Sequence, residues 1–241
     1  HMSQAVDRGA PMFKLGDTLD AMQGKGDKRS DKTDLADKHR RSDYLNSLVE
    51  EAVSFYEPYK ENLAYIGYGN HETSLIKHYE FDAVSFIVRD LQLQGSPVVK
   101  GGYRGWVKFL FTRKGKGSWR QSVNLYQIHG YGGGGPVTKD VIQASRKAVY
   151  LPDADIVVSG HTHDRNVFPI ERIRLSDHGK ESQSTQYHIK TGGYKNAFEN
   201  HDQGFEVEKG MPPKPLGGYW IRFYWSSRTN KIHYEVLETE R

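Results

Sequence analysis

A short apolar run that stops at a glycine and leads into two histidines constrains this chain more than any other stretch. Residues 156–158 are Ile-Val-Val, and Gly160 follows after a single serine. The β-branched run predicts a short strand buried on both faces of a sheet. His161 and His163 lie just beyond its carboxyl end, where open α/β sheets bind their ligands. We therefore expect a strand that delivers imidazoles to a metal site.

The composition permits one full hydrophobic core and excludes thiolate chemistry. The chain has 241 residues, of which 36% are hydrophobic, and this suffices for one globular domain. It has no cysteine, so metal ligands must come from His, Asp, Asn or Glu. We find no apolar run that could span a bilayer and no leader segment, so we expect a cytoplasmic protein without a membrane partner. The net charge of +4 gives a mild bias toward anionic partners.

Three more predicted strands end in residues that bind metals. They cover residues 11–17, 63–68 and 119–129, and the residues at their ends are Asp17, Asn70 and His129. Sheet topology can gather such ends into one crevice, where His161 would join them. A carboxylate, an amide oxygen and two imidazoles suit a borderline divalent ion. We expect Mn²⁺, with Fe²⁺, Zn²⁺ or Ni²⁺ as alternatives.

The remaining elements follow from periodicity, capping residues and turn residues. Helices are predicted over residues 43–59, after a cap at Asp82, and over residues 138–149 with Thr138 as its cap. Strands are predicted over residues 102–113, 166–175, 185–191, 218–226 and 231–238. The polar segment 24–43 is expected to be a solvated loop or a flap over the substrate, and residues 193–217 are expected to be irregular.

Four short motifs resemble, in order and spacing, those of the calcineurin-like metallophosphoesterases, in particular the form found in phage and prophage genomes. The motifs are Gly16-Asp17-Thr18-Leu19-Asp20, Gly69-Asn70-His71-Glu72, His129-Gly130 and Gly160-His161-Thr162-His163. The loop Thr191-Gly192-Gly193-Tyr194 is similar to the family's glycine-containing loop after the last histidines. The resemblance implies an α/β fold in which two mixed β-sheets pack as a sandwich flanked by helices. It also implies a single domain over residues 1–241, with an inserted basic hairpin at about residues 100–129.

The resemblance further implies that a phosphate ester is hydrolysed by metal-bound hydroxide at a two-metal site. Carried over residue by residue, Asp17 would bridge the two ions. Asn70, His129 and His161 would hold the second ion together with Asp17. His163 would hold the first ion.

Two more residues would act on the substrate. His71 would face the leaving group, and Asp20 would orient His71. One family motif has no counterpart, because an Asp-x-His is expected some tens of residues before Gly16 and only residues 1–15 precede it. We therefore expect the first strand to be missing and the first ion to bind weakly or not at all, while the second ion keeps its four ligands. A homodimer could compensate for the missing strand.

The hairpin lies in a stretch without acidic residues between Asp90 and Asp140. Cations that meet phosphates and rings that stack on bases suit a nucleic-acid surface. Because the hairpin leads into His129, its tip could overhang the site. The candidates for substrate binding are Lys114, Lys116, Arg120 and Arg165. The alternative is an ordinary hairpin whose aromatic residues pack inward and whose cations face water.

Three functions remain open on the sequence. The first is a metal-dependent phosphodiesterase or nuclease acting on DNA or RNA, which the basic, aromatic hairpin favours. The second is a phosphomonoesterase acting on a protein, a nucleotide or another small molecule. The third is a nucleic-acid-binding protein with impaired catalysis, which the absent Asp-x-His motif would explain.

Overall fold

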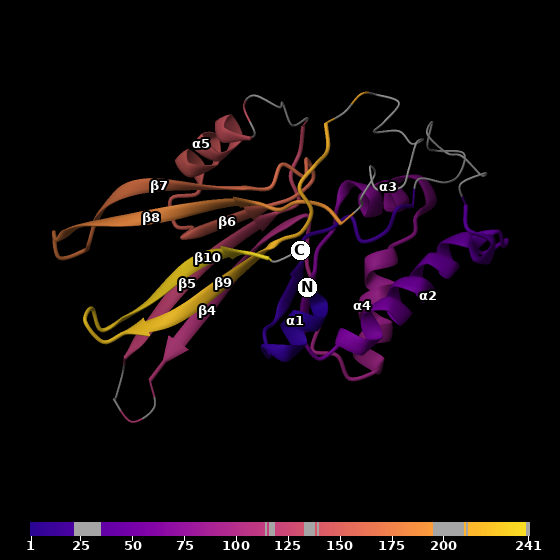
Figure 1. Ribbon diagram of the computed structural model, residues 1–241, viewed down its shortest axis with the longest axis horizontal. Helices are drawn as coiled ribbons and strands as arrows, with labels where there is room; N and C mark the ends of the chain where they lie inside the picture. Colours follow the sequence, from indigo (N-terminus) through magenta and orange to yellow (C-terminus); the bar gives the residue numbers. More distant parts are fainter. Residues whose placement is uncertain are drawn as a thin grey trace. The chain divides into compact units, whose positions relative to one another are not determined.

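Figure 1 shows the computed structural model of this chain, which describes residues 1–21, 35–113, 115, 119–132, 138, 140–194, 210 and 212–239. The chain divides into two units, His1–Gly105 and Trp106–Arg241. Within the described residues the fold is α/β, with parallel and mixed sheets flanked by helices, so the expected class is confirmed at this level. Most of the predicted polar segment 24–43, and most of the predicted irregular segment 193–217, lie outside the described residues.

The first unit is built on a three-stranded parallel sheet with the order β1-β2-β3. Two α-helices bury their apolar faces in the core of this unit, which includes Leu48 and Ala52 of α2 and Ile87 and Leu91 of α4. The elements are α1 (Met2–Asp7), β1 (Met12–Lys14), a 3-10 turn (Asp37–His39), α2 (Tyr44–Tyr56), a second 3-10 turn (Glu57–Tyr59), β2 (Leu63–Ile66), α3 (Asn70–Tyr79), α4 (Ala83–Leu93) and β3 (Val99–Lys100). The predicted helix cap is confirmed, because the Asp82 carboxylate accepts a hydrogen bond from Ser85 N at 3.0 Å.

The second unit contains a five-stranded mixed sheet with the order β4-β5-β6-β8-β7 and a separate antiparallel pair, β9 and β10. Strands β5, β6 and β8 run parallel, whereas β7 runs antiparallel to β8. In Figure 1, α5 lies against the part of the sheet that holds β7 and β8. The elements are β4 (Arg104–Thr112), which begins at the end of the first unit, then β5 (Arg120–Ile128), α5 (Val141–Tyr150), β6 (Ile156–Ser159), β7 (Asn166–Leu175), β8 (Glu181–Lys190), β9 (Tyr219–Ser226) and β10 (Lys231–Glu238).

The start of α5 differs from the prediction. Thr138 does not cap it, because the helix begins at Val141 after Asp140, whose φ of 70° is left-handed. A residue in that conformation cannot belong to a right-handed helix, so the helix starts behind it. Strand β8 also begins four residues earlier than predicted, because Glu181 pairs with Leu175 across the turn of the β7–β8 hairpin.

Among the described helices, none combines the length and the apolar character that crossing a membrane would require.

Candidate metal centre

Adjacent parallel strands of the first unit lead to two of the expected ligands. β1 and β2 are neighbours and run in the same direction, so their carboxyl ends lie at the same edge of the sheet. Asp17 follows β1, and Asn70 is the first residue of α3, directly after the loop that leaves β2. Asp17 Oδ1 accepts a hydrogen bond from His71 N at 3.2 Å, so the Asp17 carboxylate lies at the start of α3, next to Asn70 in the sequence.

The buried carboxylate of Glu72 holds the loop around Asp17 in place. Its side chain is fully buried and accepts four backbone hydrogen bonds. The donors are Asp17 N at 3.0 Å, Thr18 N at 2.6 Å, Leu19 N at 3.0 Å and Gly69 N at 2.8 Å. Bonds to an ionised acceptor are about twice as strong as neutral ones. One carboxylate therefore fastens the β1 loop to the start of α3 and fixes the direction of the Asp17 side chain.

Two glycines allow these loops to approach each other. Gly16 has a φ of 105°, and a Cβ there would lie 2.5 Å from the backbone carbon of Tyr68. A Cβ on Gly69 would overlap the carboxylate of Asp17. The glycines that begin these two motifs, Gly16 and Gly69, are therefore required by close contact, which is one of the main uses of glycine in folded proteins.

His71 is held by a backbone carbonyl rather than by Asp20. Its Nδ1 lies 3.1 Å from Leu19 O and 3.8 Å from the Asp20 carboxylate, whose side chain is largely exposed. A carbonyl can only accept a hydrogen bond, so Nδ1 carries a proton and donates it to Leu19. The ring nitrogen that remains for chemistry is Nε2.

In the second unit, adjacent parallel strands bring two histidines together. His129 follows β5 and is buried, and His161 follows β6. Gly160 N donates to His129 O at 2.8 Å, which continues the strand pairing up to the histidines. The two imidazoles meet edge to face with their centroids 5.3 Å apart, and a ring nitrogen of one lies within 4.8 Å of a ring nitrogen of the other. Two nitrogens at this separation can be drawn onto one metal ion by small rotations of the rings.

The loop after β6 holds both of its histidines in an unfavourable backbone conformation. His161 has a φ of 70° and His163 a φ of 57°. Thr162 N donates to Gly160 O at 2.9 Å across His161, which closes a tight three-residue turn. Left-handed residues other than glycine cost about 1–3 kcal/mol each and cluster at functional sites. Two of them, both histidines, are best explained by a requirement on where their rings lie.

The His163 ring lies against the glycine loop that follows β8. A Cβ on Gly193 would stand 3.1 Å from Nδ1 of His163 and 3.2 Å from its Cγ. The loop is itself fixed, because Gly192 N donates to Gly217 O and Gly217 N donates to Gly193 O, both at 2.9 Å. Gly193 therefore forms one wall of the His163 position, and this contact gives a structural reason for a glycine at that place in the loop.

Gly193→Ala is expected to destabilise the second unit by about 1–2 kcal/mol, because the new methyl group would press on the His163 ring. Unfolding in urea can be followed by tryptophan fluorescence, since all four tryptophans belong to this unit. Gly218→Ala is the matched control, because a Cβ there would meet only Tyr194 Oη at 3.7 Å, an ordinary contact. Equal stability of the two variants would show that the His163 ring is not confined by Gly193.

The residues expected to bind substrate lie in different environments. Lys114 and Lys116 are outside the described residues, and Arg120 is exposed at the start of β5. The side chain of Arg165 is largely buried. Its guanidinium donates to Leu216 O at 3.0 Å, pairs with Glu238 at 3.0 Å and stacks on the Tyr219 ring. These contacts tie the loop after β6 to the C-terminal strand pair.

The hairpin tip, which we expect to overhang the site, lies mostly outside the described residues, but the strand that leads from it to His129 is described. The turn of the hairpin adjoins Arg120 at one end of β5, and His129 follows the other end. The nine residues of β5 are extended, so Arg120 lies roughly 30 Å from His129. An extended strand holds its two ends apart, so the start of β5 lies far from His129 although the strand leads directly to that residue.

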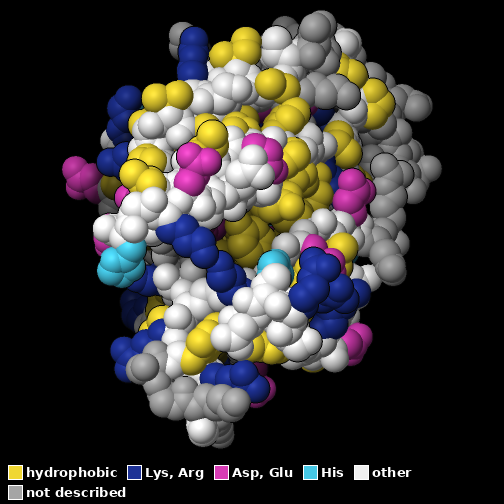
Figure 2. Space-filling model, turned by 90° about the vertical axis from the view of Figure 1, so that its left-hand side faces the viewer, with side chains coloured by type: hydrophobic (Ala, Val, Ile, Leu, Met, Phe, Trp, Pro, Cys, Tyr) yellow, Lys and Arg dark blue, Asp and Glu magenta, His cyan; other side chains and the backbone are white. Residues whose placement is uncertain are grey.

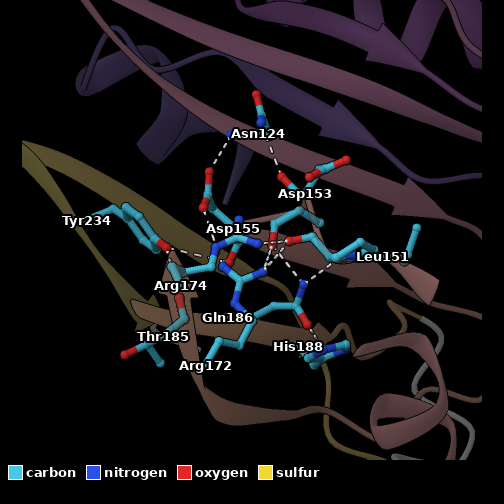
Figure 3. Close-up of polar contacts among 12 residues, drawn as sticks. Asn124, Leu151, Asp153, Asp155, Arg172, Arg174, Thr185, Gln186, His188 and Tyr234 are labelled. Carbon is cyan, nitrogen blue, oxygen red and sulfur yellow. Dashed lines mark hydrogen bonds and ion pairs between the residues drawn. The ribbon is translucent and has the colours of Figure 1, made fainter. Parts of the chain in front are cut away.

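A buried polar network fixes the other end of β6 (Figure 3). Gln186 donates to Leu151 O at 2.8 Å and to Ala154 O at 2.7 Å, and its Oε1 lies 2.9 Å from Nε2 of His188. Arg172 donates to Ala154 O at 2.7 Å and pairs with Asp155 at 3.5 Å. The network holds the segment that enters β6, so the strand that carries His161 is anchored at its start.

Each unit supplies donors that fit a divalent ion. The first unit offers the carboxylate of Asp17 and the amide of Asn70, and the second offers the imidazoles of His129 and His161. Oxygen and imidazole nitrogen together suit Mn²⁺, Fe²⁺, Ni²⁺ and Zn²⁺. Comparison with protein-family models, with curated proteins and with solved structures finds no match to this chain.

Proposed function

We propose that this chain is a metal-dependent phosphoesterase with a calcineurin-like fold, and that its substrate is a phosphodiester in DNA or RNA. The observation that carries the proposal is the placement of the motifs: in both units, adjacent parallel strands end in the residues that the resemblance identifies as ligands. Asp17 and Asn70 would bind the second ion together with His129 and His161. Asp17 and His163 would be this chain's ligands for the first ion.

The bound ions would supply charge neutralisation of the phosphate and activation of a water molecule. The other steps belong to side chains of this chain. His71 donates its Nδ1 proton to Leu19 O, which aims Nε2 away from the loop. In the imidazolium form both ring nitrogens carry protons, and Nε2 would give its proton to the leaving oxygen. Glu72 would hold Asp17 and His71 in fixed positions, because its carboxylate binds the backbone of Asp17 and of Gly69.

The test is bound Mn²⁺ per chain, counted together with hydrolysis of a diester dye and of a monoester dye. The wild type is expected to bind Mn²⁺ and to prefer the diester. His161→Ala is expected to lower kcat/KM by more than about 100-fold and to lose bound Mn²⁺, because it removes a ligand nitrogen. His178→Ala is the matched control, since His178 lies exposed in the β7–β8 turn.

Several results would contradict the proposal in different ways. Preference for the monoester would select a phosphomonoesterase instead. Unchanged Mn²⁺ binding in His161→Ala would remove this histidine from the metal site. No hydrolysis with any divalent ion, while nucleic acid still binds, would select a binding protein with impaired catalysis.

A further inference from the structure

A pocket of about 250 Å³ lies where the two hairpins of the second unit meet. It is lined by Phe111, Thr112, Arg113, Trp119, Trp225 and Ile232, which come from the ends of β4 and β9 and the starts of β5 and β10. Figure 2 faces this end of the molecule and shows hydrophobic and basic side chains side by side. Sites for small molecules typically measure about 300–1,000 Å³, so this pocket suits a single flat ring.

The pocket walls are groups that stack on rings. Trp119 and Trp225 meet edge to face with their centroids 4.9 Å apart. The Arg113 guanidinium lies over the Trp225 ring, 5.0 Å from its centroid. Indole rings and guanidinium planes are the groups on which proteins stack unpaired bases.

The two hairpins are fastened together beside the pocket. Gln121 of β5 donates to Ile232 O of β10 and accepts from Ile232 N, and both bonds are 2.8 Å long. The same two hairpins also meet through the Phe111 ring of β4 and the Phe223 ring of β9, whose centroids lie 5.2 Å apart. A pocket whose walls are already fixed loses little conformational freedom when it binds a ligand.

The charge around the pocket favours an anionic ligand. Both hairpins lack Asp and Glu here: none occurs between Asp90 and Asp140, and none in residues 219–234. Exposed Arg120, Arg228 and Lys231 lie at the described strand ends around the pocket. An arginine in the wall opposes a cationic ligand, and a neutral sugar would gain nothing from the surrounding cations. A ring attached to a phosphate satisfies both the stacking walls and the cations.

We propose that this pocket binds one unpaired base of a single-stranded nucleic acid, at a distance from the metal centre. The inference rests on the proposed function, whose substrate class it specifies. Because the pocket lies at the far end of β5, roughly 30 Å from His129, a strand stacked at about 3.4 Å per nucleotide spans the two places with roughly nine nucleotides, and a dinucleotide is too short to reach both. Short substrates bind only at the metal centre, and long strands bind at both places.

Binding of a fluorescent single-stranded 15-mer, measured by anisotropy in EDTA, tests the pocket without catalysis. Trp119→Leu is expected to weaken binding by roughly tenfold, because it removes a stacking surface. Arg113→Gln, a surface change that spares the core, is expected to weaken it several-fold. The matched controls are Trp106→Leu and Lys108→Gln on exposed positions of β4, and each is expected to change binding less than its partner in the pocket.

An abasic 15-mer separates base stacking from phosphate attraction. The wild type is expected to bind it about as weakly as Trp119→Leu binds the normal strand, and Trp119→Leu is expected to lose nothing further. Equal binding of both strands by the wild type, or equal binding of the normal strand by wild type and Trp119→Leu, would overturn the inference. The pocket would then belong to another occupant, such as a peptide side chain.

Hydrolysis of the diester dye separates this inference from the proposed function. The dye is too short to reach the pocket, so Trp119→Leu is expected to leave its kcat/KM unchanged. Failure of the wild type to hydrolyse the dye with any metal, with base-dependent binding intact, would overturn the phosphoesterase and leave the pocket. Normal dye hydrolysis without base-dependent binding would do the reverse.

Discussion

Glu72→Gln is expected to destabilise the first unit by about 3 kcal/mol and to abolish Mn²⁺ binding. The fully buried carboxylate accepts four backbone hydrogen bonds, two at each oxygen. A glutamine of the same shape offers one oxygen and one NH₂ group, so two backbone donors would face another donor. Hydrogen bonds to a charged group are worth about 1.5–3 kcal/mol each, and a buried donor left without an acceptor adds its desolvation cost. The loop that carries Asp17 would then detach from α3.

Urea unfolding followed by far-UV circular dichroism measures this effect, because four of the five described α-helices belong to the first unit. Glu61→Gln, an exposed glutamate of the same unit, is the control and is expected to change the stability by less than about 0.5 kcal/mol. If Glu72→Gln unfolded at the same urea concentration as the wild type, the carboxylate would not be what holds the loop. Retained Mn²⁺ binding in a folded Glu72→Gln would separate the loop from the metal site.

The strands that end in ligand residues could be predicted because each is indicated by a pattern of a few neighbouring residues. The Ile-Val-Val run before His161 predicts a buried strand, and β6 spans Ile156–Ser159 with all four residues buried. The amphipathic spacing of α2 and the Asp82 cap of α4 are equally local. In the second unit, the prediction that the strands before His129 and His161 end close together depends on these strands lying side by side in one direction. β5 and β6 are such a parallel pair.

The contacts that position these residues could not be predicted, because they join distant parts of the chain. Glu72 belongs to a predicted motif, but three of its four bonds reach back to residues 17–19 and depend on the pairing of β1 with β2. Asp20 was expected to orient His71, yet the nearer Leu19 carbonyl takes the Nδ1 proton. A backbone acceptor carries no residue-type signal, so this contact is invisible in a sequence. The two-residue strand β3 is also too short to leave a pattern.

Lowering the pH from 7 to 5 is expected to destabilise the second unit by about 2 kcal/mol through His188 alone. Burial, with smaller contributions from Lys147 and Arg172, lowers the pKa of His188 from its ordinary value of 6.5 to about 4. The neutral ring donates from Nε2 to Gln186 Oε1, which can only accept because the Gln186 amide donates to Leu151 and Ala154. Between pH 6.5 and 4 the unfolded chain therefore binds a proton that the folded chain does not, so stability falls as the pH falls through this window.

The comparison that isolates this effect is urea unfolding of wild type and His188→Gln at pH 7 and pH 5, followed by tryptophan fluorescence. His188→Gln keeps an NH donor toward Gln186 but does not titrate, so its loss between the two pH values is expected to be about 2 kcal/mol smaller than that of the wild type. His178→Ala removes an exposed histidine of the same unit and is expected to keep the wild-type loss. Equal losses in wild type and His188→Gln would mean that His188 is protonated in the folded protein. The Gln186 network would then have to accommodate a charged ring at the start of the strand that carries His161.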